Sequence, residues 1–279
     1  MGFGENQQRL ERDFFLCKWS ELWYNIRNIE KNEGKAMKTM KRSRLVIAIV
    51  LAVMAATLAG IACYAGDYYH ATGEAAAALV SDGNVTVTVD SNCLTFAPEK
   101  AEAGFIFYPG GKVEYTAYAP LMRDLAQEGI LCVVPHMPLN LAVLDMDAAA
   151  DVFRNYEVEK WYIGGHSLGG AMAASYAAKH PEEFEGLVLL ASYSTQDLKG
   201  TGLSVLSLYG SADGVLDLEK YEEYRTNLPE DAVETILDGG CHACFGSYGP
   251  QEGDGDHTLT REEQTTLTAA YILDIIRAG

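Results

Sequence analysis

The sequence predicts an α/β fold with a mostly parallel central sheet and helices on both faces, preceded by one transmembrane helix. Three observations predict it. Short apolar runs alternate with helical stretches from residue 104 onward, as in parallel sheets covered on both sides. Polar or glycine-rich turns follow several of these runs, where ligands bind in such sheets. A run of 21 uncharged residues stands before all of them.

The first element is that uncharged run, Leu45 to Ala65, which is long enough to cross a bilayer as one helix. Basic residues precede it at positions 35, 38, 41, 42 and 44. The positive-inside rule therefore predicts a single-pass protein of the cell membrane, with residues 1–44 cytoplasmic, residues 45–65 as the anchor and residues 66–279 extracytoplasmic.

Two other interpretations of the apolar run stay open. A cleaved secretory signal has the same charge pattern, but this run is longer than the usual apolar region of about 7–15 residues. Acylation at Cys63 is less favoured, because Gly60 stands where a lipobox normally carries a leucine-like residue. An uncleaved anchor is the preferred interpretation.

The net charge of −18 is unevenly distributed along the chain. Residues 1–65 carry ten Lys/Arg and six Asp/Glu, so residues 66–279 carry eleven and thirty-three, a net of 11 − 33 = −22. A field of this sign repels phosphate backbones. It argues against nucleic acid as a partner and leaves a small neutral substrate open.

The elements of residues 66–279 follow from the apolar pattern. A helix around residues 68–79 precedes an antiparallel pair of strands, because polar and apolar residues alternate there. These two strands and the later ones are predicted at residues 85–89, 92–96, 104–108, 131–134, 161–164, 187–191, 203–209 and 233–237. The later helices are predicted near residues 119–128, 146–156, 168–180, 218–228 and 260–276.

Ser167 is the predicted nucleophile. It lies in Gly165-His166-Ser167-Leu168-Gly169, directly after one predicted strand and before a helix. The Gly-x-Ser-x-Gly pattern alone is weak evidence, but a nucleophile elbow requires this strand-turn-helix setting. The two glycines are expected because side chains at 165 and 169 would collide with adjacent strands or with the helix.

A serine hydroxyl needs a base to take its proton and an acid to orient that base. Asp213 follows the strand at 203–209, and His242 follows the strand at 233–237. In the chain the serine comes first, the aspartate second and the histidine third. This is the order expected when a nucleophile elbow carries the serine. Asp217 is the alternative acid and His257 the alternative base.

Acyl transfer also needs two donors for the developing oxyanion. The backbone N–H of Leu168 is the first predicted donor. The second is expected from the turn after the strand at 104–108, where Pro109-Gly110-Gly111-Lys112 brings backbone close to a substrate. Gly111 is the preferred residue there, and Lys112 is the alternative.

Cys241 and Cys244 are the only cysteines that lie close together in the sequence. They either form a bridge or stay reduced. Zinc binding through Cys241, His242 and Cys244 is a weaker alternative, because the spacing lacks a paired second half. No metal site and no cofactor site is predicted.

Three phrases carry a family resemblance: Phe107-Tyr-Pro-Gly-Gly-Lys, Trp161-Tyr-Ile-Gly-Gly-His-Ser-Leu-Gly-Gly and Gly239-Gly-Cys-His-Ala-Cys-Phe-Gly-Ser-Tyr-Gly. With them the stretch 104–276 resembles the α/β-hydrolase superfamily, in particular small bacterial membrane-anchored members. Cys241 departs from the pattern, which has Asn before the histidine. The resemblance implies that a small-molecule ester or related acyl bond is cleaved through an acyl-enzyme, without a metal or organic cofactor. Only 46 positions separate Ser167 from Asp213, so no large cap domain is expected.

The predicted function is therefore that of a carboxylesterase-like serine hydrolase with Ser167, Asp213 and His242 as its triad. Two alternatives remain. An acyltransferase would use the same triad with an acceptor other than water. A membrane-tethered binding protein would keep the fold without the activity, since fold does not fix function.

Overall fold

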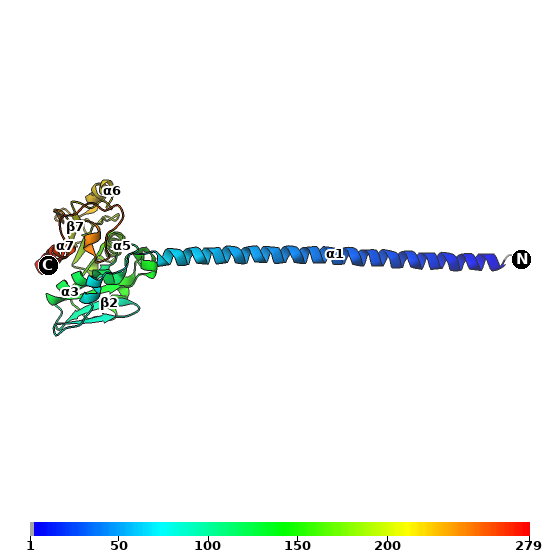
Figure 1. Cartoon of the computed structure of the whole chain (residues 1–279), viewed down its shortest axis with the longest axis horizontal. Coiled ribbons are helices and arrows are strands. Elements are labelled where there is room, and N and C mark those ends of the chain that lie inside the picture. Colours follow the sequence, from blue (N-terminus) through cyan, green and yellow to red (C-terminus); the bar gives the residue numbers. More distant parts are fainter. Residues whose placement is uncertain (1–2) are drawn as a thin grey trace. The chain divides into compact units, whose positions relative to one another are not determined.

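The computed structural model of the protein describes residues 3–279. Contacts within the chain divide it into two units, Met1–Tyr64 and Ala65–Gly279. Helix α1 (Phe3–Gly66) is one continuous helix (Figure 1). Its part Met40–Gly66 is unburied, and is long and apolar enough to cross a membrane. The first two residues of the predicted segment 1–44 lie outside the described residues. The placement of this segment on the cytoplasmic side of the membrane stays a prediction.

The second unit is built on one eight-stranded sheet in the order β1-β2-β4-β3-β5-β6-β7-β8. The pairs β1–β2 and β2–β4 are antiparallel, and every other pair is parallel. Strands β2 and β7 lie toward opposite ends of this unit in Figure 1. The mostly parallel sheet with an antiparallel opening is confirmed. The strands are β1 (Val85–Val89), β2 (Cys93–Pro98), β3 (Ala103–Tyr108), β4 (Ile130–Pro135), β5 (Trp161–His166), β6 (Gly186–Leu190), β7 (Ser204–Gly210) and β8 (Val233–Leu237).

The helices of this unit lie near their predicted positions. Several are shorter than predicted. Helix α2 begins only at Gly73, because Tyr69 forms a β-bridge with Val113 instead. Helix α4 ends where Asn155 N–H donates to Val152 O, α5 ends at Ala177, and α6 runs into the 3₁₀ turn Arg225–Asn227. Such tighter bonds commonly end a helix. The helices are α2 (Gly73–Ala78), α3 (Ala119–Gln127), α4 (Ala148–Phe153), α5 (Leu168–Ala177), α6 (Leu218–Tyr224) and α7 (Arg261–Ala278).

Strand β3 shows how both faces of the sheet are covered. Its fully buried side chains alternate between two apolar clusters. Phe105 and Phe107 join the cluster that contains residues of α3 and α7, whereas Ile106 and Tyr108 join the cluster that contains residues of α4 and α5. A strand buried on both sides must be apolar throughout, which explains its continuous apolar run.

The connection between β6 and β7 is short. Residues 191–203 form it, and the structure describes neither a helix nor a strand within that range. A cap domain inserted after β6 would stand here. The expectation that the chain carries no large cap at this position is met.

Candidate active site

Ser167 lies in a strained turn between β5 and α5. Its φ is 52° and its ψ is −123°, a region that residues with side chains rarely adopt. Both of its backbone polar groups are held: N–H donates to Leu190 O at 2.9 Å, and C=O accepts from Ser192 Oγ at 2.8 Å. Bonds to the last residue of β6 and to the second residue beyond it therefore fix the turn.

The two glycines of the turn are required by close packing. A Cβ on Gly165 would lie 2.7 Å from Tyr108 O, and one on Gly169 would overlap both Tyr108 O and Pro109 O. Backbone atoms cannot move aside as the end of a side chain can. The steric reason inferred from the sequence is confirmed.

Gly169→Ala is expected to destabilise the protein by about 3 kcal/mol or more, because the new methyl group overlaps two carbonyl oxygens. Urea unfolding of the 66–279 segment measures the loss. Gly73→Ala in α2 is the matched control, since a Cβ there meets nothing within 4 Å. Equal stability of the two variants would contradict the close packing.

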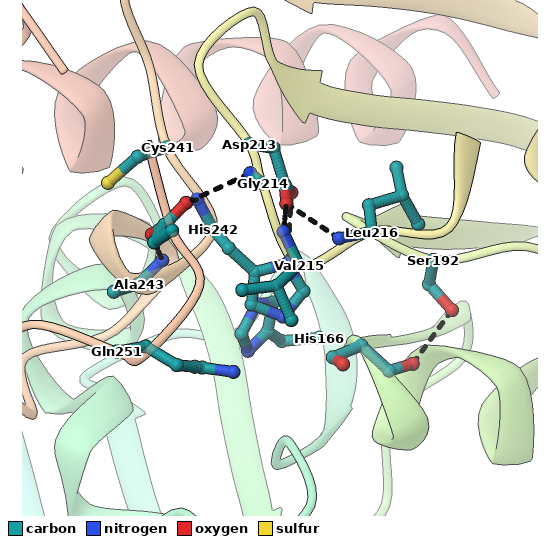
Figure 2. A network of polar contacts seen from close by, with 12 residues as sticks. His166, Ser192, Asp213, Gly214, Val215, Leu216, Cys241, His242, Ala243 and Gln251 are labelled. Carbon is teal, nitrogen blue, oxygen red and sulfur yellow. Dashed lines mark hydrogen bonds and ion pairs between the residues drawn. The ribbon is translucent and has the colours of Figure 1, made fainter. Parts of the chain in front are cut away.

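Asp213 and His242 come together as a buried pair. Asp213 follows β7 and His242 follows β8, and Asp213 Oδ2 lies 2.9 Å from His242 Nδ1. The two side chains are 0% and 2% exposed. The second carboxylate oxygen accepts from the N–H groups of Val215 and Leu216 at 2.9 and 2.8 Å (Figure 2). The carboxylate is thus oriented before any substrate arrives.

Ser167 is not hydrogen-bonded to this pair. Within residues 3–279 no hydrogen bond joins the Ser167 hydroxyl to the His242 imidazole. Catalytic hydrogen bonds are often long before substrate binds, so the contact stays a prediction. The His166 ring packs against the His242 ring instead, with centroids 4.5 Å apart at a tilt of 51°.

His166 connects the turn at Ser167 to the loop after β3 through Tyr118, a contact that the sequence did not indicate. Its Nδ1 lies 2.9 Å from Tyr118 Oη, which also accepts from Gly110 N–H at 2.9 Å. Because the phenol oxygen accepts there, its proton is free for His166 Nδ1. The only feature of the sequence that drew attention to His166 was its position next to Ser167. Tyr118 lies in none of the motifs, so there was no reason in the sequence to expect its contact with His166.

The buried His166 is expected to weaken the fold as pH falls. Burial, aided by the neighbouring His242, holds its pKa well below the usual range. An unfolded histidine takes a proton near pH 6.5, so below that the unfolded state binds a proton that the folded state does not. The free energy of unfolding should then fall by up to about 1.4 kcal/mol per pH unit from this group.

Urea unfolding of the 66–279 segment and of His166→Asn, between about pH 7.5 and about pH 5, isolates this effect. Any stability advantage of the parent over the variant should shrink as pH falls. A constant difference between the two proteins across this range would show that His166 is not held neutral.

The two predicted oxyanion donors are neighbours. A Cβ on Gly111 would lie 3.0 Å from Leu168 Cδ2. Among the described residues no hydrogen bond uses the backbone N–H of Gly111 or of Leu168. The N–H of Lys112 donates to Asn140 O at 2.8 Å, which leaves it unsuited as the alternative donor.

The alternative acid and base have other partners. Asp217 caps α6 by accepting from Lys220 N–H at 3.1 Å, and it pairs with the Lys220 ammonium at 3.2 Å. His257 Nδ1 lies 2.7 Å from Leu259 O. Neither residue has a hydrogen bond to Asp213 or His242 within the described part of the chain.

The two close cysteines lie beside this histidine loop. Cys241 Sγ donates to Cys244 Sγ at 2.9 Å, and both residues are buried. The bond from Cys241 lowers the pKa of Cys244 to about 7, and the same contact raises the pKa of Cys241. Among the described residues the group of possible metal ligands joins these two sulfurs with His257 and does not include His242, so the zinc alternative with His242 as its third ligand is not supported.

Comparison with known proteins agrees with this architecture. Residues 104–266 match the model of a family described as "Alpha/beta hydrolase family". No curated protein matches the chain.

Similar solved structures include a predicted CIB-like hydrolase from Thermoplasma acidophilum, with a TM-score of 0.51 and 17% identity over 68% of this chain and 100% of that one. A membrane phospholipase A described as a bacterial virulence factor has a TM-score of 0.52 and 17% identity over 85% and 98%. An α/β hydrolase from the sediment metagenome of the Mar Chica lagoon, Morocco, has a TM-score of 0.50 and 17% identity over 68% of this chain and 98% of that one.

Proposed function

The chain belongs to the α/β-hydrolase family, and we propose that it is a serine hydrolase that cleaves a carboxylic ester or a related acyl bond through an acyl-enzyme. Family membership supports hydrolysis in general. The buried hydrogen bond between Asp213 and His242, at the same strand ends as the strained Ser167, is the observation that carries the finer assignment.

In the proposed reaction Ser167 Oγ attacks the acyl carbon while His242 Nε2 takes the hydroxyl proton. Asp213 holds the proton on Nδ1 and stabilises the imidazolium that forms. The N–H groups of Leu168 and Gly111 donate to the oxyanion. His242 then gives its proton to the leaving alcohol, and water, deprotonated by the same nitrogen, releases the acid from Ser167.

The experiment that tests this assignment is labelling of the purified 66–279 segment by a fluorophosphonate probe, beside Ser167→Ala and His242→Ala. Labelling of the parent alone, with release of free acid from short-chain esters, supports the proposal. A folded parent that is not labelled would refute it and favour the binding-protein alternative. Transfer of the acyl group to an added alcohol or amine, in place of acid release, would favour the acyltransferase.

We further propose that α1 anchors the protein in the cell membrane with the hydrolase domain outside. The unburied apolar stretch Met40–Gly66 and the basic residues around its start support this orientation. Protease added to intact cells should then remove the 66–279 domain while a cytoplasmic control protein survives. Full protection of the domain, with an exposed surface protein digested, would reverse the orientation.

A further inference from the structure

Three groups that can bind a metal ion lie together beside the histidine loop, outside the triad. They are Cys241 Sγ, Cys244 Sγ and a ring nitrogen of His257, and all lie within 4.8 Å of one another. Cys244 Sγ is 4.0 Å from both ring nitrogens of His257. Thiolate sulfur and imidazole nitrogen are the ligands that zinc prefers in proteins.

The hydrogen bond of the His257 ring leaves one of its two nitrogens free to bind a metal. Its Nδ1 lies 2.7 Å from Leu259 O, a carbonyl that can only accept. The proton of the neutral ring therefore sits on Nδ1, and the lone pair of Nε2 is free. A backbone carbonyl on the other ring nitrogen is the usual partner that fixes the tautomer of a metal-binding histidine.

The loop that carries the two thiols is held independently of any ligand. Gln264, which is fully buried, accepts from Cys241 N–H and donates to Cys241 O, both at 2.9 Å. The Asp254 carboxylate accepts from His242 N–H at 3.1 Å and from Ala243 N–H at 2.8 Å. Both donors are neutral backbone N–H groups, so these hydrogen bonds leave the negative charge on the Asp254 carboxylate, which lines the same cavity as the two sulfurs.

The cluster opens to a cavity of about 380 Å³ that Cys241, Cys244, Asp254 and His257 help to line. Arg261 also lines this cavity, but its guanidinium pairs with Glu74 at 2.9 Å. A cation placed between the three donors would keep a fourth position facing the cavity, for water or another small ligand.

We propose that Cys241, Cys244 and His257 form a binding site for a borderline-soft divalent cation of the Zn²⁺ class. On binding, the two thiols lose their protons to water and the cation replaces the proton they share. With zinc–sulfur bonds of about 2.3 Å in tetrahedral geometry, the sulfurs would move apart to roughly 3.8 Å. They lie 2.9 Å apart without the cation.

The bound cation would add a direct link between two segments that Asp254 also joins, through its bonds to His242 N–H and Ala243 N–H. His257 ends the glycine-rich stretch 249–257, and the cysteines flank His242. A cation bound at this site would therefore cross-link the stretch 249–257 to the loop that carries the proposed catalytic base. The cation takes no part in the proposed reaction, so the site stands or falls separately from the proposed function.

The test uses the full chain in detergent, reduced, stripped with a chelator and titrated with Co²⁺ as a spectroscopic probe. One equivalent should bind and give thiolate-to-cobalt charge transfer with the visible bands of tetrahedral cobalt, and Zn²⁺ should abolish them. Cys244→Ser and His257→Asn should each weaken binding more than tenfold. Cys93→Ser and His180→Asn, which change the same residue types elsewhere, should bind as the parent does.

Several results would overturn the proposal. One is the absence of charge transfer in a folded, fully reduced chain, and another is binding by Cys244→Ser equal to that of the parent. A third is a Cys241–Cys244 disulfide, detected by mass spectrometry, that persists in a glutathione buffer despite excess Zn²⁺. His257 is exposed, so His257→Asn keeps the test decisive even if the buried cysteine variant fails to fold.

Discussion

Ser167→Ala is expected to lower kcat for ester hydrolysis by roughly 10⁴–10⁶-fold, because the methyl group of alanine cannot attack the acyl carbon. Steady-state hydrolysis of a short-chain chromogenic ester by the 66–279 segment measures the loss. The fold should remain intact, since the Ser167 side chain accepts or donates no hydrogen bond within the described residues. A rate close to that of the parent would exclude Ser167 as the nucleophile.

Ser167→Gly is the companion variant that separates the hydroxyl from the backbone strain. Glycine adopts a φ of 52° without a steric penalty, so this variant should unfold at a higher urea concentration than Ser167→Ala. It should be as inactive as the alanine variant. Equal stability of the two would mean that the turn stores no strain at this residue.

Asp213→Asn is expected to lower kcat by about 10⁴-fold with little structural change. The asparagine Oδ1 can still accept from Val215 and Leu216, while its NH₂ group faces His242 Nδ1. An NH₂ group there forces the imidazole proton onto Nε2, which then cannot take the proton of Ser167. The same ester assay, with circular dichroism to verify folding, checks this outcome.

The control for that variant is Asp217→Asn, which makes the same chemical change four residues away. Asparagine caps a helix about as well as aspartate, and Asp217 caps α6. This variant should keep both activity and stability. A severe loss at Asp217 together with a mild loss at Asp213 would reassign the acid of the triad.

The strands and the position of the serine could be predicted because local sequence determines them. A strand buried on both faces must be continuously apolar, as 104–108 and 187–191 are. The elbow needs small residues at 165 and 169 because backbone occupies the space of their side chains. Asp213 and His242 were found because parallel strands deliver the residues that follow them to one edge.

Contacts between distant segments could not be predicted from local patterns. Tyr118 precedes α3 by one residue, and only the folded chain brings its hydroxyl between Gly110 and His166. His257 was considered as a base from its sequence alone, whereas folding places it next to Cys244. The lengths of α4 and α6 were overestimated, because single tightened hydrogen bonds at their ends leave no clear pattern in composition.

The short connection between β6 and β7 bears on the time course of turnover. Where a mobile cap covers a site, its opening and closing often limit the rate. The structure describes no helix or strand of a cap within residues 191–203. We therefore expect the slowest step of turnover to be one in which a bond is made or broken. If release of the acid from Ser167 is the slowest step, esters of one acid with different alcohols should share a common kcat. A burst of alcohol release should then precede the steady state.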